Sequence, residues 1–466
     1  MRLIIAFLTV ASLLVGCDSS KKSDKNEVAN TATPDTAATE TFEPSRADIA
    51  LMDTLQKQTF DYFWEGAQPN SGLAAERIHL NNIYPSNDKH IVTTGGSGFG
   101  LMAILVGVKR GYITKEQALD RYVQAVDFLK KADRFHGAWP HWMDDNTGKV
   151  KPFSKYDDGG DLVETAFLIQ GLLTVAEYYK GDPSEEAKKL VADIQKLYEE
   201  VEWDWYTKGE NVLYWHWSPN VGWKMNFPVG GYNECLVMYV LAAASPTHSI
   251  SKEVYEQGWA KDGAISKDTT YYGLSTVLDH YEHNNDPVGP LFWAHYSYLG
   301  LNPKGLEDQY GDYWRLNRNH ALIQYRYCVD NPKRFKGYGE NCWGLTSSYS
   351  MRGYAGHHPG KSDLGVISPT AALSSMPYTP IESIQFLRYM YREQDSLIGK
   401  YGPYDAFSLE EEWYLPRYLA IDQGPIPVMV ENYRSGLLWD LFMKNEDVNN
   451  GLVKLGFKSP YLDKKS

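Results

Sequence analysis

The sequence predicts an all-α fold of the (α/α)6 barrel type, which is a double ring of helices with long loops gathered at one end. Apolar residues recur every three or four positions along most of the chain, and alternating strand-like runs are few. Glycine pairs at 95–96, 159–160 and 230–231 each precede an apolar segment, and a more charged segment follows. Six such units would fill the body of the chain, which favours one closed double ring over several domains.

The helical periodicity covers the chain from Ile49 nearly to the end. Thr114 and the Pro183-Ser184 pair stand before acidic first turns, as helix starts require. Within each unit we expect the apolar helix inside and the amphipathic helix outside. The predicted helices cover 49–64, 97–110, 114–133, 160–181, 183–202, 231–245, 251–262, 307–329, 380–396, 430–444 and 448–457.

Long connections rich in Gly, Pro and aromatic residues separate these helices. Connections of this length without their own periodicity are usually functional. Since they precede the apolar helices, we expect them to meet at one end of the barrel and to wall a cleft. They cover 66–94, 134–158, 203–229, 263–288, 335–367 and 397–429.

The N-terminus predicts a bacterial lipoprotein. Arg2 is followed by an apolar run too short to span a bilayer, and Leu14-Val15-Gly16-Cys17 resembles a lipobox in which the cysteine is lipidated. Residues 1–16 are therefore expected to be a signal peptide, 17–46 a disordered lipidated tether, and 47–466 a single catalytic domain. We expect a monomer in the cell envelope, held to the membrane by its lipid alone and facing the periplasm, because Cys17 is followed by no acidic run.

Charge and cysteine content exclude several classes of protein. The formal net charge of −13 argues against nucleic-acid binding, which needs a concentrated basic face. CxxC and HExxH motifs do not occur in the sequence, and no metal or other cofactor is expected. After Cys17, three cysteines remain, and the sequence does not establish whether Cys328 and Cys342 pair.

Acidic residues at helix starts are the candidates for catalysis. Asp157, Asp161 and Glu164 surround the start of the helix predicted at 160–181, where a single Asp would satisfy the cap. Glu234 is the only charged residue between Lys224 and Lys252, and its burial would raise its pKa as a general acid requires. Asp422 lies in a late loop before Gly424-Pro425, where a turn role is equally typical.

Aromatic side chains are numerous, with 14 Trp, 34 Tyr and 16 Phe, and many lie in the long loops. Trp and Tyr combine an apolar ring with a polar tip, which suits stacking on and hydrogen bonding to sugars. A large aromatic core would give the same composition, so the prediction concerns the group more than any member. The candidates for substrate binding are Trp139, His141, Trp142, Trp215, Trp217, Tyr232, His295, Trp343 and Arg352.

Other catalytic motifs find less support. The glycines of 95–100 lack the spacing of a dinucleotide site, and neither a phosphate-binding loop nor a nucleophile elbow is present in the sequence. Acid–base chemistry by carboxyl groups remains, and glycoside hydrolysis is its commonest use.

Four motifs, Thr94–Gly100, Asp157–Glu164, Gly231-Tyr232-Asn233-Glu234 and Asp422-Gln423-Gly424-Pro425, together resemble the bacterial glucoamylase-like proteins of glycoside hydrolase family 144. The resemblance covers roughly residues 47–460. It implies an (α/α)6 barrel and inverting hydrolysis of β-1,2-glucan, either within the chain or by release of sophorose from its ends. All five acidic candidates fall on acidic positions of the family.

A related fungal family protonates the leaving oxygen through a substrate hydroxyl. By analogy, Glu234 is expected to be the general acid and Asp422 the general base, with the other acids in support. Two alternatives stay open at this point, namely a polysaccharide lyase on the same barrel and a glycan-binding lipoprotein without catalysis. A lyase would need a cationic site for uronate carboxylates, which the acidic residues disfavour.

Overall fold

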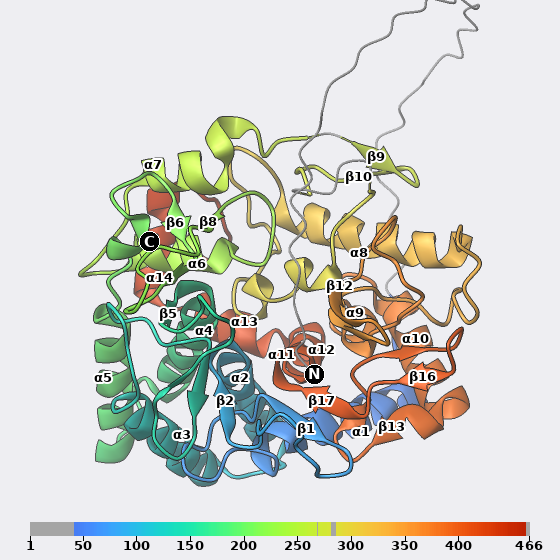
Figure 1. Ribbon diagram of the computed structural model, residues 1–466, viewed down its shortest axis with the longest axis horizontal. Helices are drawn as coiled ribbons and strands as arrows, with labels where there is room; N and C mark the ends of the chain where they lie inside the picture. Colours follow the sequence, from blue (N-terminus) through green and yellow to red (C-terminus); the bar gives the residue numbers. More distant parts are fainter. Residues whose placement is uncertain (1–41, 268, 281–285, 463–466) are drawn as a thin grey trace, which may run out of the picture. The chain divides into compact units, whose positions relative to one another are not determined.

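The computed structural model describes residues 42–267, 269–280 and 286–462, and this part of the chain is predominantly helical (Figure 1). The expected signal peptide, the lipidated Cys17 and most of the expected tether lie outside the described residues. Among the residues from 42 onward that the structure describes, no helix combines the length and the apolar run needed to cross a membrane.

Helices follow the predicted periodicity with differences of a few residues at most ends. The α-helices are α1 (Arg46–Trp64), α2 (Thr94–Arg110), α3 (Lys115–Leu129), α4 (Leu162–Tyr179), α5 (Glu185–Glu199), α6 (Leu236–Ala244), α7 (Lys252–Val254), α8 (Tyr313–Asp330), α9 (Pro369–Leu373), α10 (Pro380–Glu393), α11 (Ala420–Gln423), α12 (Pro425–Ser435), α13 (Leu437–Phe442) and α14 (Glu446–Leu455).

Two predicted helices differ from the structure for local reasons. The range 251–262 contains the three residues of α7, a π-helical turn at Tyr255–Trp259 and the start of a 3-10 turn at Lys261–Gly263, in place of one continuous α-helix. The range 430–444 is divided at Gly436, whose φ of +72° ends α12 and begins α13. The side chain of Asn432 accepts hydrogen bonds from the first amides of α13, at 3.1 Å from Leu438 and Trp439. The left-handed conformation of Gly436 therefore ends the helix, although apolar residues continue to recur at helical spacing beyond it.

The apolar helices α2 and α4 are buried and pack on each other, as their composition predicts. Glycines permit their close approach: a Cβ at Gly98 would lie 2.1 Å from the carbonyl oxygen of Phe167, and one at Gly171 would lie 2.2 Å from that of Gly98. The charged helices α3 and α5 pack together outside them, with N-caps from Thr114 and Ser184.

Partly buried ion pairs join the first two helices of the body to the last third of the chain. Arg388 of α10 binds both oxygens of Asp48 of α1, at 2.6 and 2.7 Å. Arg110 of α2 binds Glu431 of α12 in the same bidentate way. Such paired guanidinium–carboxylate contacts fix orientation as well as distance, so the segments that begin and end the body are held side by side.

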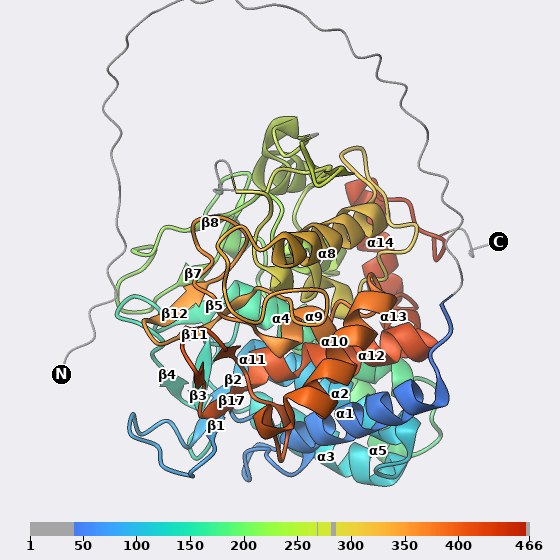
Figure 2. The same cartoon turned by 90° about the vertical axis from the view of Figure 1, so that its right-hand side faces the viewer.

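Short strands lie at one end of the helical body, on the left in Figure 2. Three strands lead directly into helices, β2 into α2, β5 into α4 and β17 into α11. Helices α4 and α11 carry candidate acidic residues, and α2 contacts the acid of α4. The strands form the antiparallel pairs β1–β17, β5–β7, β6–β8, β9–β10, β11–β12, β13–β14 and β15–β16 and the sheet β2–β3–β4.

The strand bounds are β1 (Arg77–His79), β2 (Ile91–Thr93), β3 (Trp142–Asp144), β4 (Val150–Lys151), β5 (Gly160–Asp161), β6 (Leu213–Tyr214), β7 (His216–Trp217), β8 (Pro228–Val229), β9 (Thr270–Tyr271), β10 (Leu274–Ser275), β11 (Ser347–Ser350), β12 (Gly353–Gly356), β13 (Ile398–Gly399), β14 (Gly402–Pro403), β15 (Phe407–Ser408), β16 (Trp413–Tyr414) and β17 (Arg417–Leu419). One of the few strand-like runs in the sequence, at 212–217, contains β6 and β7.

The cysteines of the described residues lie in the core. Cys235, Cys328 and Cys342 are free thiols, and all three are buried.

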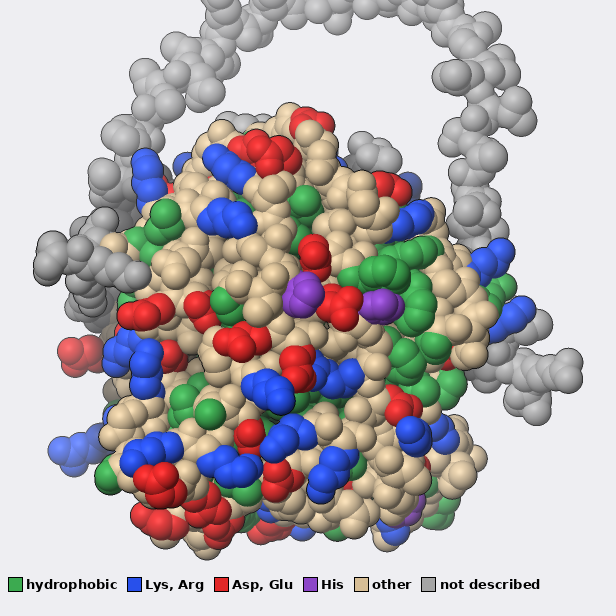
Figure 3. Space-filling model, turned by 90° about the vertical axis from the view of Figure 1, so that its left-hand side faces the viewer, with side chains coloured by type: hydrophobic (Ala, Val, Ile, Leu, Met, Phe, Trp, Pro, Cys, Tyr) green, Lys and Arg blue, Asp and Glu red, His purple; other side chains and the backbone are tan. Residues whose placement is uncertain are grey.

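Acidic and basic side chains are interspersed over the face shown in Figure 3, so the net negative charge is not gathered there into one patch.

Candidate active site

Buried carboxyl groups converge on the end of the body where the strands lead into the helices. Asp157, Asp161 and Glu164 stand at the start of α4, Glu234 just before α6, and Asp422 in α11. Each of the five is less than one-tenth exposed. Buried carboxylates are unfavourable unless they are hydrogen-bonded, paired or protonated, so the partners of each decide what it can do.

Asp161 is fully occupied by hydrogen bonds. One carboxylate oxygen accepts from the backbone amide of Glu164 at 2.9 Å and so caps α4. The other accepts from Nε1 of Trp215 at 2.9 Å and from Nδ1 of His141 at 3.0 Å. These three bonds make Asp161 an anchor for the surrounding side chains.

Asp157 completes this cluster from the preceding loop. Its carboxylate lies 3.3 Å from Nδ1 of His141 and 3.4 Å from Nε2 of His216. His141, Asp157 and Asp161 have the spacing of ligands to a small cation. However, Nδ1 of His141 serves as a donor to both carboxylates, and a nitrogen that carries a proton cannot coordinate a metal.

Glu164 is held by the glycine pair at the start of α2. Its Oε2 accepts from the amide of Gly95 at 2.7 Å, and a Cβ at Gly95 would lie only 2.6 Å from that oxygen. Burial raises the pKa of Glu164 to about 7. Burial opposes protonation of His141, but Glu164, Asp157 and Asp161 outweigh it and raise the pKa of the imidazole well above its usual value. The cluster therefore contains a cationic histidine among carboxyl groups.

Glu234 has a different environment. It lies in the segment that enters α6, the most apolar helix near the site, and its backbone carbonyl accepts from the hydroxyl of Ser297. Burial raises the pKa of its carboxyl to about 7, and the charge of Glu164 acts in the same direction. Near neutral pH this side chain is therefore partly protonated, whereas an ordinary glutamate is ionised.

Asp422 is coupled electrostatically to a second buried carboxyl group, that of Asp405. Asp405 lies between β14 and β15, and the carboxylate oxygens of both residues are buried without a hydrogen-bond partner among the described residues. Burial raises the pKa of Asp405 to about 7, although Asp422 and Arg417 act to lower it. Burial and the neighbouring Asp405 raise the pKa of Asp422 well above its usual range. Two such carboxyls share one proton over a wide range of pH.

Tyr296 connects Glu234 with Asp422. Its phenol interacts electrostatically with the carboxyl group of Asp422. After burial, the charges of Asp422, Glu234 and Glu164 all contribute to the raised pKa of its phenol. Acidic residues of α4, of the segment before α6 and of α11 therefore lie around the phenol of Tyr296 and form one site.

The structure divides the predicted substrate-binding residues into two groups. His141, Trp142 and Trp215 are half-buried beside the α4 cluster, whereas the half-buried Trp217 packs on His136 and Trp205. His141 stacks on the exposed Phe153 with 4.0 Å between ring centroids, and Trp142 meets Phe153 edge-on at 4.9 Å. These rings form a partly solvent-accessible aromatic wall beside the acids.

The second group consists of four core side chains and one exposed arginine. Trp139, Tyr232, His295 and Trp343 are core side chains that bond to Leu129, Asn317, Ser375 and Glu382, respectively. Burial lowers the pKa of His295 to about 3, so it is neutral. Arg352 is exposed at the turn between β11 and β12.

Three residues of the site were missed from the sequence. Asp405 is the lone acid in the aromatic segment 401–408, which resembles the setting that singled out Glu234. Tyr296 follows His295 directly. The side chain of His295 lies in the core, whereas that of Tyr296 lies near the acidic residues of the site. His216 lies between Trp215 and Trp217 in an alternating run, and the prediction of substrate binding concerned the two tryptophans and not the histidine between them.

Comparisons with known proteins identify the family of the chain. A model of the family described as "Putative glucoamylase" matches residues 226–446. An endo-β-1,2-glucanase structure from Chitinophaga pinensis is 59% identical and covers 90% of this chain and all of its own, with a TM-score of 0.88. The chain belongs to the glucoamylase-like proteins of glycoside hydrolase family 144.

Two further relatives define the limits of the similarity. An exo-β-1,2-glucooligosaccharide sophorohydrolase of Parabacteroides distasonis is 43% identical over 430 residues. The matched region covers 88% of this family 144 chain but only 58% of the length of that relative. An endo-β-1,2-glucanase of Talaromyces funiculosus is 10% identical with a TM-score of 0.61 and covers 84% of this chain, which shows a shared fold.

Proposed function

We propose that this protein is an inverting glycoside hydrolase that cleaves β-1,2-glucan or its oligosaccharides. The observation that carries the proposal is the meeting of Glu234 and Asp422 at Tyr296, with a partly protonated carboxyl on one side and a carboxyl pair on the other. An inverting hydrolase needs one carboxyl to donate a proton and another to accept one. The 59% identical endo-β-1,2-glucanase supports the substrate class.

Glu234 is the proposed general acid. Its raised pKa leaves the carboxyl partly protonated at neutral pH. The protonated form can deliver its proton to the leaving glycosidic oxygen, through a substrate hydroxyl by analogy with the fungal family. The bond from the anomeric carbon to that oxygen then breaks. Glu234 is left as a carboxylate, and solvent restores its proton after product release.

Asp422 is the proposed general base, with Asp405 as its partner. The pair with one shared proton carries one negative charge and can accept a second proton. A water molecule gives that proton to Asp422 as its oxygen bonds to the anomeric carbon on the face opposite to the leaving group. His141, Asp157, Asp161 and Glu164 hold the adjacent wall and place a positive charge beside it.

Incubation with linear β-1,2-glucan tests this assignment. We expect new reducing ends and, by proton NMR, an initial product anomer inverted relative to the substrate. Product sizes over time separate internal cleavage, which gives mixed lengths, from release of sophorose at chain ends. The control substrates are β-1,3-, β-1,4- and α-1,4-glucans, and absence of product from β-1,2-glucan would overturn the proposal. An unsaturated product absorbing in the ultraviolet would instead indicate a lyase.

Two finer features are part of the same proposal. The helices are proposed to complete an (α/α)6 barrel, which the pairing of apolar and charged helices at α2–α5 supports. The chain is also proposed to be anchored in the cell envelope through lipidated Cys17, as the Leu14–Cys17 motif indicates. A Cys17→Ser variant should leave the membrane fraction, and its retention there would contradict the anchor.

A further inference from the structure

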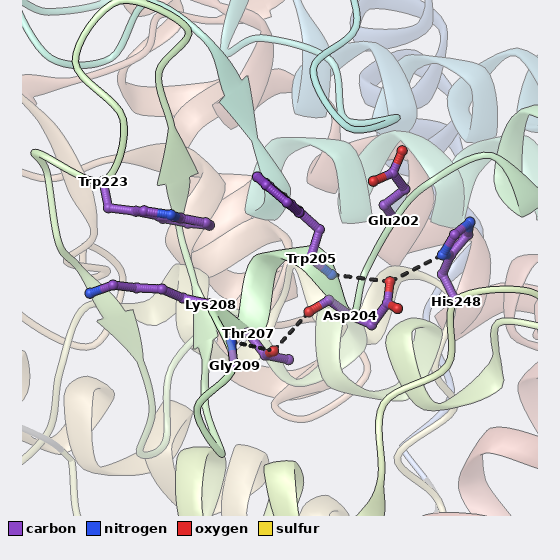
Figure 4. Close-up of a pocket in the computed structure, with 8 residues that line it drawn as sticks. All are labelled: Glu202, Asp204, Trp205, Thr207, Lys208, Gly209, Trp223 and His248. Atoms are coloured by element: carbon purple, nitrogen blue, oxygen red, sulfur yellow. Dashed lines mark hydrogen bonds and ion pairs between the residues drawn. The ribbon is translucent and has the colours of Figure 1, made fainter.

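A surface pocket of about 470 Å³ lies apart from the catalytic carboxyl groups (Figure 4). Its walls come from the segment that follows α5 and from two later loops, and its volume is in the usual range for small-ligand sites, roughly 300–1,000 Å³. The lining residues are Glu202, Asp204, Trp205, Thr207, Lys208, Gly209, Trp223 and His248. None of these residues has a part in the mechanism above, so the pocket needs its own explanation.

Trp205 presents an unusually large apolar surface to solvent for an indole, with 41% of the residue exposed. One side of its ring is covered by the imidazole of His136, which stacks on it at 3.8 Å and 14°. His136 is in turn held by Glu202, with 2.9 Å between Nδ1 and the carboxylate. The indole is therefore braced from behind and remains open toward the pocket.

Trp223 forms a second aromatic wall. Its ring centroid lies 6.4 Å from that of Trp205 at an angle of 32°, and the edges of Tyr206 and Tyr214 support it at 6.0 and 5.8 Å. The separation is too small for a sugar ring to lie between two parallel indoles. The rings are placed instead as neighbouring platforms on a continuous wall, which suits consecutive units of a chain.

Polar groups surround these platforms. The Asp204 carboxylate is exposed and lies 3.1 Å from Nδ1 of His248, and the ammonium of Lys208 contacts the side-chain oxygen of Asn226 at 3.1 Å. In Figure 4 the Lys208 and Asp204 side chains line the pocket beside the indoles. Donors and acceptors around an open aromatic face match a pyranose ring, which has apolar C–H faces and a rim of hydroxyls.

Strand β7 connects this pocket to the catalytic centre. Successive side chains of a strand point to opposite faces, and His216 and Trp217 do so here. His216 lies 3.4 Å from the Asp157 carboxylate, whereas Trp217 packs edge-on against His136 and Trp205 at 4.9 and 6.2 Å. β7 also pairs with β5, which carries Asp161. One two-residue strand therefore has the acids on one side and the indole platform on the other.

We propose that the Trp205–Trp223 pocket is an accessory binding site for a β-glucan chain, which it holds beside the catalytic centre without cleaving it. This rests on the proposed function only for the identity of the sugar. The site stacks glucosyl residues on Trp205 and bonds their hydroxyls to Asp204 and Lys208. Its consequence is a preference for long chains, because only these reach both the pocket and the acids.

The test compares Trp205→Ala with Tyr272→Ala, which removes an aromatic ring of similar exposure (38%) from the distant hairpin between β9 and β10. Affinity for long linear β-1,2-glucan is measured by gel retardation in a Glu234→Gln background. Removal of one stacking platform should weaken it about five- to tenfold, which corresponds to roughly 1 kcal/mol. In the otherwise unchanged enzyme, KM should rise by a similar factor for long glucan and stay constant for sophorotriose, with kcat unchanged.

Each other outcome has a defined meaning. Unchanged retardation by Trp205→Ala, or an equal loss in Tyr272→Ala, would overturn the accessory site. An equal loss for sophorotriose would also overturn it, because Trp205 would then act on the catalytic centre through Trp217. If the Glu234→Gln parent binds no β-1,2-glucan and the unchanged enzyme hydrolyses none, the proposed function fails as well, and glucans of other linkage become the probe.

Discussion

The two acidic regions of the site differ in how their charge is satisfied. At the start of α4, Asp161 accepts three hydrogen bonds and Asp157 faces two histidines. At Asp405–Asp422, the two carboxyl groups are coupled electrostatically, and burial raises both pKa values. Glu234 resembles the second region, because no ion pair to it occurs among those of the described residues.

This difference separates acids that hold the site together from acids that exchange protons. A carboxylate with several donors fixes the groups that surround it, whereas burial near another acid raises the pKa of a carboxyl group, as at Asp405, Asp422 and Glu234. Burial alone does not distinguish them, since all of these acids are nearly inaccessible. The predictions below change one region and leave the other intact.

The largest expected effect is that of Glu234→Gln on turnover. The amide keeps the shape but cannot donate the catalytic proton, so kcat should fall by about 10³-fold or more, with an unchanged circular dichroism spectrum. Glu340→Gln, an exposed glutamate far from the site in sequence, is the matched control. Turnover within threefold of the parent would remove Glu234 from the mechanism.

Asp405→Asn should have a smaller effect on kcat and a distinctive effect on pH dependence. The amide can donate to Asp422 and removes a neighbouring negative charge, so the pKa of Asp422 should fall and the base should weaken. We expect kcat to drop about 10- to 100-fold and the acidic limb of its pH profile to move down by about one unit. Asp363→Asn replaces a buried Asp held by two tyrosine hydroxyls, and its acidic limb should not move.

Asp161→Asn should act mainly on stability. The change weakens the bonds from His141 and Trp215 and the cap of α4, so the free energy of unfolding should fall by about 2–4 kcal/mol. Urea denaturation followed by tryptophan fluorescence measures this loss. Unchanged stability combined with a large loss of kcat would place Asp161 among the proton-exchanging acids and would blur the contrast between the two regions.

The smallest expected effect is a gain of stability in Glu234→Gln at high pH. The folded-state pKa of about 7 exceeds the unfolded value of 4.5, so the folded protein binds more protons and its stability falls as pH rises between these values. Above pH 7 the ionised, buried carboxylate costs about 1–3 kcal/mol, and the variant avoids this cost. Denaturation at pH 5 and pH 8 should show the gain at pH 8 only, and an equal gain at both would contradict the raised pKa.

The sequence was most informative where one physical cause dominates. Helical periodicity located α2, α4, α5 and α8, because burial of an apolar face determines those segments. It failed at Gly436, where a left-handed backbone ends a helix, and at 255–259, where the backbone forms a π turn. Both depend on local conformations that an apolar period does not contain.

For the site, the sequence identified isolated acids in apolar surroundings but not their partners. Glu234 and Asp422 are visible as lone charges, whereas the Asp405–Asp422 pair depends on a loop fold that brings two segments together. Aromatic content likewise predicted a sugar site as a whole. It could not tell the core Trp139 and Trp343 from the accessible Trp142 and Trp215, because all are indoles beside loops.

The enclosure of the three cysteines has a consequence for maturation. Burial raises the pKa values of Cys235 and Cys328 well above the usual thiol value and that of Cys342 to about 12, so the folded chain offers oxidants almost no thiolate. In an oxidising compartment, these cysteines can therefore form incorrect disulfides only before the core has folded. A finished molecule should resist alkylating reagents until it is denatured, and its durability should not depend on any enzyme that forms or rearranges sulfur bridges.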